Sequence, residues 1–304
     1  MDAILQIQNL CKRYGDHLAV DDISFSVPRG SVFGLLGPNG AGKTTTIRMI
    51  MRIIASDSGT VLLDDLPVDD DRRRIIGYLP EERGLYNKMK VLEHLVYLGT
   101  IRGLRPGEAR KRSSAWLERF ELDEWATHKV EDLSKGMQQK IQLIGTILHR
   151  PPLLILDEPF SGLDPINTRQ LKNLLQSMTE EGVTIVLSTH VLPQVDELCS
   201  DICLINRGRP ILLGSLDRIR GEYGGNTWKV HSDLDAGDLG GLPGVTSTHP
   251  LGDDYLVELG EGHNPRELLR ALVDQGQVDS FTRFVPDLEN IFIRAVEEDR
   301  SHAE

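Results

Sequence analysis

The sequence predicts an α/β fold in which a sheet with a parallel core is covered by helices. Short apolar segments typical of buried strands alternate with segments of helical periodicity over most of the first 225 residues. A glycine-rich turn joins the first of these strands to the helix that follows it. The strands are expected at residues 31–36, 153–156 and 184–187, and the helices at residues 43–53, 167–178 and 192–198.

Residues from about 85 to 150 interrupt this alternation. From Val91 to Arg150 the sequence shows helical periodicity almost throughout and contains no convincing strand pattern. Helical packing or solvent contact explains His94 and His149 in this stretch better than ligand binding does. The sequence therefore predicts a helical insertion within the α/β domain.

The last part of the chain differs in charge from the rest. The 304 residues carry 34 basic and 46 acidic side chains, for a net charge of −12. Residues 226–304 hold 16 of the acidic and 6 of the basic side chains, which is a net −10. The segment 221–226 is typical of a linker. We therefore expect domains at residues 1–225 and 226–304, the second a small α+β domain with strands at 228–230 and 254–259 and a helix at 265–274.

Composition excludes several classes of protein. The net acidic charge argues against a protein whose main task is to grip nucleic acid. No apolar run approaches the roughly 18 residues that cross a bilayer, and the N-terminus lacks the pattern of a signal peptide. Three cysteines make neither a disulfide framework nor a zinc set. We expect a protein of the reducing cytoplasm.

A phosphate-binding pattern, G-x-x-x-x-G-K-[ST], lies between the first predicted strand and helix. Glycines let the loop wrap closely, so that backbone N–H groups point at phosphate oxygens. We expect Lys43 to reach the β- and γ-phosphates and the Thr44 hydroxyl to bind Mg²⁺. A chance glycine turn is the alternative, which the strand–loop–helix context disfavours. The residues expected to contact the nucleotide here are Gly37, Pro38, Asn39, Gly40, Ala41, Gly42, Lys43, Thr44 and Thr45.

An apolar strand at residues 153–156 ends in two carboxylates, Asp157 and Glu158. A strand end beside a phosphate loop is where Mg²⁺ needs an acidic partner, which we assign to Asp157, acting through water. Glu158 would polarise the attacking water as general base. The alternative, two ordinary solvated acids at a strand end, is much weaker beside a phosphate loop.

Together with these motifs, Leu133-Ser134-Lys135-Gly136-Met137-Gln138-Gln139-Lys140 resembles the signature of the ATP-binding subunits of ABC transporters. Ser161-Gly162-Leu163-Asp164 resembles the D-loop of that family, and His190 its switch histidine. Tyr14 matches the aromatic residue that stacks on adenine. The resemblance spans residues 3–225 and implies a P-loop NTPase fold with an ABC-type helical insertion.

Three positions depart from the family pattern. The signature usually has Gly where Lys135 stands and Gln where Met137 stands, and the Q-loop has Gln where Glu81 stands. Glu81 can still ligate Mg²⁺, but it adds a charge beside the phosphates. The string Pro-Glu-Glu-Arg-Gly-Leu-Tyr at 80–86 and the tail at 284–292 resemble a subgroup of exporter ATPases that includes sodium-extrusion and drug-resistance systems.

The resemblance implies an ATPase that works as a pair of subunits, which we expect to be a homodimer, with ATP and Mg²⁺ at the interface. Each subunit would supply Lys43, Glu158 and His190 as catalytic residues for one ATP. The facing subunit would contact its γ-phosphate through Ser134 and Gly136. A separate membrane permease would form the transport path, docking on the helical insertion and the loop after Glu81. The chain would then be peripheral on the inner face of the membrane.

Two alternatives remain at this stage. One is a soluble ABC ATPase that acts on ribosomes or DNA, although such relatives carry two modules per chain, or coiled-coil or zinc insertions. The other is a regulator that binds ATP without turnover, against which Glu158 and His190 argue.

Overall fold

The computed structural model describes residues 2–82, 84–260 and 262–301. Residues 1, 83, 261 and 302–304 lie outside the described residues. They include Arg83 of the string at 80–86 and the first and last residues of the two expected domains. The chain divides into two compact units, Met1–Ser215 and Leu216–Glu304.

The division between the units falls before Leu216, whereas the charge pattern predicts it after Gly225. The helix α7, Leu216–Gly224, belongs to the second unit because it packs against α10, Leu288–Ser301. The hydroxyl of Tyr223 donates a hydrogen bond to Glu298 Oε2 at 3.2 Å. This helix has no net charge, so the change in charge along the sequence begins only after it.

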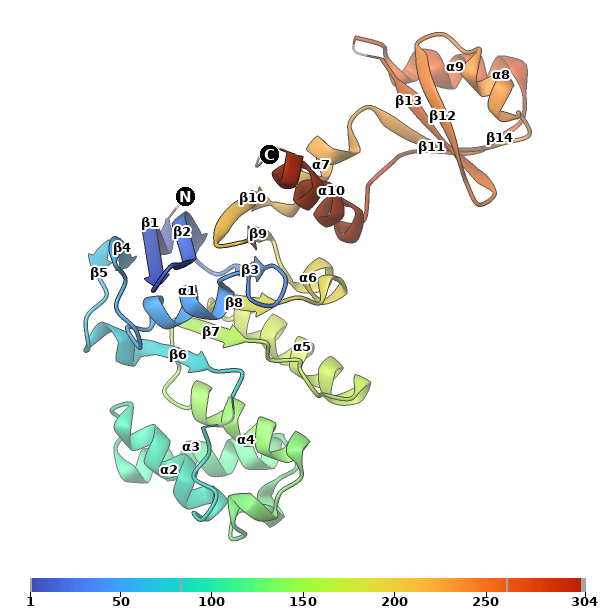
Figure 1. Ribbon diagram of the computed structural model, residues 1–304. Coiled ribbons are helices and arrows are strands. Elements are labelled where there is room, and N and C mark those ends of the chain that lie inside the picture. The colour runs from blue at the N-terminus through green and yellow to red at the C-terminus, as the bar shows by residue number, and fades with distance from the viewer. Residues whose placement is uncertain (1, 83, 261, 302–304) are drawn as a thin grey trace. The chain divides into compact units, whose positions relative to one another are not determined.

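The first unit begins with an antiparallel sheet in the strand order β2-β1-β4-β5 (Figure 1). Its two long strands pair through several register shifts, and Asn9 and Asp22 adopt positive φ angles of 48° and 54°. Such bulges interrupt the alternation of polar and apolar residues, so the sequence pattern does not predict this sheet. Its strands are β1 (Ala3–Tyr14), β2 (His17–Pro28), β4 (Ser58–Leu63) and β5 (Leu66–Pro67).

The second sheet of this unit is the predicted one, with a parallel core. Its strand order is β10-β9-β3-β8-β7-β6, and only β10 runs antiparallel to its neighbour. The carboxyl ends of β3 and β7 therefore open on the same edge, and β8 lies between them. The strands are β3 (Val32–Leu36), β6 (Ile76–Leu79), β7 (Leu153–Asp157), β8 (Thr184–Thr189), β9 (Asp201–Asn206) and β10 (Arg209–Ser215).

Helices cover the parallel sheet. Helix α1, Lys43–Ile50, packs with both sheets in one buried cluster that includes Phe33, Ile47 and Leu153. Helix α5, Pro165–Glu180, packs against β8, and α6 spans Leu192–Leu198. These helices confirm the α/β fold predicted from the alternating pattern.

The predicted helical insertion contains three helices, which lie together at the lower end of the view in Figure 1. They enclose their own apolar cluster, which includes Leu95, Leu117 and Ile144. Residues 91–150 are all described, and no extended strand runs among them. The elements are α2 (Val91–Ile101), α3 (Pro106–Arg119) and α4 (Lys135–Ile147), with short 3-10 turns at Asp123–Trp125 and Val130–Asp132; another such turn, Arg72–Ile75, precedes β6.

The second unit is an α+β domain, as predicted. Its antiparallel sheet has the strand order β12-β13-β11-β14, and one apolar cluster joins Val230 and Val257 of the sheet to Leu239 and Leu268 of two helices. Beside α7 and α10, its elements are β11 (Thr227–Ser232), α8 (Ala236–Gly240), β12 (Val245–Leu251), β13 (Asp254–Leu259), α9 (Pro265–Gln275) and β14 (Val278–Arg283).

Candidate nucleotide site

The loop between β3 and α1 has a backbone that requires glycine. Gly37, Gly40 and Gly42 have φ angles of 148°, 79° and 111°. A Cβ atom at Gly42 would lie 2.6 Å from the carbonyl oxygen of Ala19, too close for any other residue. The loop leads directly into α1, whose first N–H groups receive no side-chain cap. Free N–H groups and the positive end of a helix together favour a bound anion such as phosphate.

Lys43 is buried at the start of α1, with 6% of its side chain exposed. Its ammonium donates to the carbonyl oxygens of Gly37 at 2.7 Å and Pro38 at 3.3 Å. Glu158 Oε1 lies 3.7 Å from Lys43 Nζ. A buried cation needs such partners because an uncompensated charge is costly away from water. The contacts hold the ammonium at the phosphate loop.

Asp157, the last residue of β7, is buried beside α1. Its Oδ1 accepts a hydrogen bond from the Ser188 hydroxyl, whereas its buried Oδ2 has no hydrogen-bond partner. Burial raises the pKa of the Asp157 carboxyl, against the opposing effect of the hydroxyls of Ser188 and Thr44. A buried carboxylate oxygen without a partner, near a threonine hydroxyl, is a donor set that fits Mg²⁺.

Glu158 follows β7 with a positive φ of 49°, a conformation that is uncommon for a residue with a side chain. Its backbone N–H donates to the Ser188 carbonyl at 3.0 Å, which fixes the turn. Its Oε1 lies 2.8 Å from Nδ1 of His190, whose side chain is 49% exposed. Strained backbone of this kind often marks functional positions. The turn aims the Glu158 carboxylate at Lys43 and His190.

These groups face a cleft with a volume of about 380 Å³. Tyr14, which is 49% exposed, and Glu81 line it together with the phosphate loop residues 39–45. His17 and Ala19 also line it, although neither belongs to a sequence motif. Because His17 pairs with Tyr14 across a hairpin, recognising the hairpin between β1 and β2 would have identified it.

A second cavity of about 100 Å³ adjoins the cleft, since Glu81 and Glu158 line both. Gln139 and Gln142 of α4 also line it, and so does Asp157. Gln139 belongs to the signature string, but no sequence pattern places it or Gln142 beside the acidic residues.

Hydrogen bonds connect the two glutamines to the chain on either side of the acidic residues. Gln142 Nε2 lies 3.2 Å from the Pro80 carbonyl oxygen and 3.3 Å from that of Glu82, which flank Glu81. Gln139 Nε2 donates at 2.6 Å to the carbonyl of Pro159, the residue after Glu158. Residues 139 and 142 are three apart, so they share one face of the helix. That face binds the backbone beside both acidic residues.

The signature residues lie apart from the nucleotide cleft. Ser134 caps α4, and its Oγ accepts a hydrogen bond from the Met137 N–H at 3.3 Å. Neither Ser134 nor Gly136 is among the described residues that line the cleft of the same chain. The structure thus brings together every other predicted site residue but leaves these two outside.

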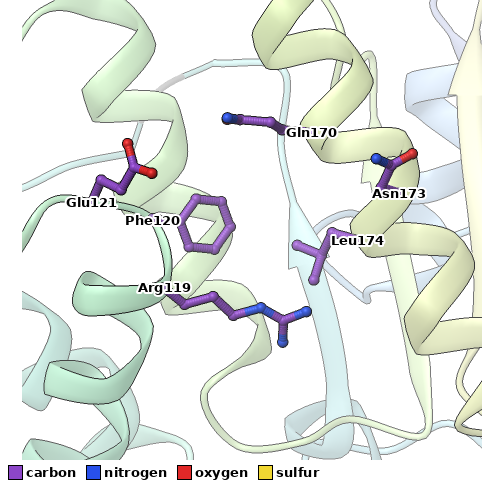
Figure 2. Close-up of a pocket in the computed structure, with 6 residues that line it drawn as sticks. All are labelled: Arg119, Phe120, Glu121, Gln170, Asn173 and Leu174. Carbon is purple, nitrogen blue, oxygen red and sulfur yellow. The ribbon is translucent and has the colours of Figure 1, made fainter.

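A further pocket of about 250 Å³ lies where the insertion meets α5 (Figure 2). Figure 2 shows Phe120 and Leu174 on opposite sides of it, with Arg119 reaching below. None of the predicted site residues lines this pocket, which Arg119, Phe120, Glu121, Gln170, Asn173 and Leu174 enclose.

The glycine loop at the start of α1, with buried Asp157 and the Glu158–His190 pair, defines a P-loop site for a nucleoside triphosphate. The family model for ABC transporters matches residues 20–161, and the model for the C-terminal domain of DrrA1-3-like ATP-binding proteins matches residues 214–296.

Relatives extend the match to nearly the whole chain. It is 42% identical to the ABC transporter ATP-binding protein YhaQ of Bacillus subtilis strain 168, covering 96% of this chain and 98% of that protein. It is 35% identical to the Nod factor export ATP-binding protein I of Cupriavidus metallidurans strain CH34, covering 97% of each. The linearmycin resistance ATP-binding protein LnrL of B. subtilis is 37% identical, over 74% of this chain and 73% of the relative.

A solved ATP-binding subunit of an ABC transporter superimposes with a TM-score of 0.68 at 33% identity, over 73% of this chain and 93% of that one. The chain therefore belongs to the family of ABC transporter ATP-binding proteins, and it is the ATP-hydrolysing subunit of such a transporter. Within the described residues, no helix is both long and apolar enough to span a membrane.

Proposed function

We propose that this chain hydrolyses ATP with Glu158 as general base and that the hydrolysis powers export through a separate membrane permease. The observation that carries the chemical part is the position of Glu158 Oε1, 2.8 Å from His190 Nδ1 and 3.7 Å from Lys43 Nζ. A carboxylate beside the phosphate-binding lysine can take a proton from water attacking the γ-phosphate.

The other residues of the cleft bind and orient the nucleotide. Lys43 and the N–H groups of the P-loop bind the β- and γ-phosphates and stabilise the charge that develops on them. Thr44, Asp157 and Glu81 would hold Mg²⁺. When bound there, the ion neutralises phosphate charge and polarises the γ-phosphate. Tyr14 stacks on the adenine. The His190 imidazole keeps the Glu158 carboxylate directed toward the γ-phosphate.

A second copy of the chain completes each site. Ser134 and Gly136 lie at the start of α4, outside their own chain's cleft, where they can face the γ-phosphate bound by a partner. A homodimer related by two-fold symmetry then holds two equivalent sites, each made from two chains. The position of Ser134 at a helix N-terminus suits contact with an anion.

Transport requires a partner that spans the membrane. The helical insertion and the loop after Glu81 are the expected docking surface for the permease, which would hold the chain on the inner face of the membrane. Two relatives are named for Nod factor export and linearmycin resistance, which favours export over import. The relatives are transporter subunits, and this favours transport over a role on ribosomes or DNA.

The substitution Glu158→Gln tests the chemical part. It keeps the size of the side chain and removes the base, so phosphate release should fall by about 10²–10⁴-fold while ATP stays bound. Phosphate release and retained nucleotide are measured on the purified chain with Mg²⁺. Glu180→Gln, an exposed carboxylate at the end of α5, is the matched control and should leave the rate unchanged. Near-normal turnover in Glu158→Gln would remove Glu158 from the mechanism.

A further inference from the structure

Tyr14 stands at the end of β1, where the strand turns back into β2. The strand pairs with β4 only as far as Cys11, opposite Ser58. Beyond that point, Tyr14 pairs with His17 in a hairpin and is 49% exposed. A half-exposed ring on a hairpin tip has several orientations open to it unless a neighbour fixes the strand. The structure supplies one such neighbour.

Asp57 binds the strand immediately before Tyr14 at two successive residues. Its Oδ1 accepts from Lys12 Nζ at 2.8 Å, and its Oδ2 accepts from the Arg13 N–H at 2.7 Å. Its own N–H donates to the Cys11 carbonyl at 3.0 Å. These contacts extend the attachment of β1 past its last pairing with β4. They end directly at the residue that carries the ring.

Lys12 connects the same carboxylate to the ring itself. Its ammonium lies over the Tyr14 ring, 5.6 Å from the centroid, while it is bound to Asp57. Cations favour the face of an aromatic ring. A ring with a cation on one face offers only its other face to a purine. The Asp57–Lys12 pair therefore determines both the position of the strand and which ring face is free.

We propose that Asp57 is a positioning residue for the base of the nucleotide, acting through Lys12 and the Arg13 N–H on Tyr14. The proposal rests on the proposed role of Tyr14 in stacking on adenine. Asp57 does not line the cleft, so it acts without touching the nucleotide. The hydrogen bonds from Lys12 and the Arg13 N–H also lower the pKa of the Asp57 carboxyl.

The substitution Asp57→Asn tests this because it keeps the shape of the side chain but removes one acceptor and the charge. Two probes are compared by calorimetric titration with Mg²⁺: adenylyl imidodiphosphate, which has a base, and tripolyphosphate, which has none. We expect a dissociation constant about threefold to tenfold higher for the first, a part of what a stacked base contributes, and no change for the second. Asp65→Asn is the matched control, because Asp65 accepts from Gln6 elsewhere in the same sheet.

A double-mutant cycle separates positioning from general damage. In a Tyr14→Ala chain, Asp57→Asn should cause no further loss of affinity for adenylyl imidodiphosphate. Equal loss for both probes, the same loss in the Tyr14→Ala background, or no loss at all would each overturn the proposal. If Tyr14→Ala alone weakens binding while Asp57→Asn does not, only the role of Asp57 fails. If Tyr14→Ala alone has no effect, the stacking role of Tyr14 fails first.

Discussion

The nucleotide cleft and the helical insertion differ in the partners of their buried polar groups. In the cleft, the buried charges of Lys43 and Glu158 lie 3.7 Å apart, and the half-exposed His190 lies 2.8 Å from Glu158. In the insertion, His94 is fully buried and neither of its ring nitrogens is hydrogen-bonded. Charged groups that must act on a substrate are thus collected at strand ends, while the insertion keeps its interior neutral.

The difference indicates a division of labour. The cleft contains the groups that can bind phosphate and move a proton. The insertion contributes contacts instead: Ser134 at the start of α4, and Gln139 and Gln142 against the backbone beside Glu158 and Glu81. Substitutions in the cleft should therefore change the binding or hydrolysis of ATP. Substitutions in the insertion should change the stability of the fold or the effect of the insertion on the acidic residues of the cleft.

The largest of the following effects concerns the neutral interior of the insertion. Burial lowers the pKa of His94 to about 4, below its ordinary 6.5. The unfolded chain therefore binds this proton more readily, so stability is full above pH 6.5 and falls as the pH drops toward 4. We expect His94 to reduce the free energy of unfolding by about 2 kcal/mol between pH 7 and pH 5.

Denaturant unfolding at pH 7 and at pH 5 measures this effect. His94→Leu should remove that part of the pH dependence, while His128→Leu, which alters an exposed histidine of the insertion, should keep it. An unchanged pH dependence in His94→Leu would show that His94 is not held neutral by burial.

A smaller effect is expected where the insertion contacts the cleft. Gln142→Leu removes the hydrogen bonds to the carbonyls that flank Glu81 but leaves the phosphate loop intact. We expect kcat to fall about tenfold and KM for ATP to change less than about twofold, because binding groups are untouched. The control is Gln176→Leu, at an exposed position of α5, which should leave kcat and KM unchanged. If steady-state ATPase measurements show a raised KM with a normal kcat, Gln142 supports ATP binding and does not act on the hydrolysis step.

The smallest effect is expected from removing the second unit. Both sheets of the first unit are complete at Ser215, where β10 ends. A chain ending there should fold and bind ATP with affinity unchanged within about twofold, since none of the described cleft residues lies beyond it. Thermal unfolding with and without Mg-ATP provides the measurement. An insoluble product, or loss of the shift that ATP causes, would mean that the second unit is part of the ATPase core.

The sequence was sufficient to predict the parallel sheet, because strands such as 153–156 are short, wholly apolar and followed by distinctive motifs. It did not reveal the antiparallel sheet, since bulges near Asn9 and Asp22 break the alternation on which strand prediction depends. Motif residues were identifiable because their chemistry requires particular residue types. The contacts of Gln139, Gln142 and Asp57 were not, because each joins segments far apart in sequence through a backbone group that any residue could provide.

The central claim is that each ATP site combines Lys43 and Glu158 of one chain with Ser134 of another. Mixing two inactive variants, Ser134→Arg and Lys43→Ala, tests it most directly. If the sites are composite, a mixed dimer has one interface with both lesions and one with neither. The mixture should then recover up to about a quarter of the normal ATPase rate, because half of the dimers are mixed and each keeps one intact site.

Mixed dimers are verified by two affinity tags, and a control dimer with a single intact site establishes that one site suffices. No recovery under those conditions would place Ser134 at its own chain's nucleotide and contradict the account.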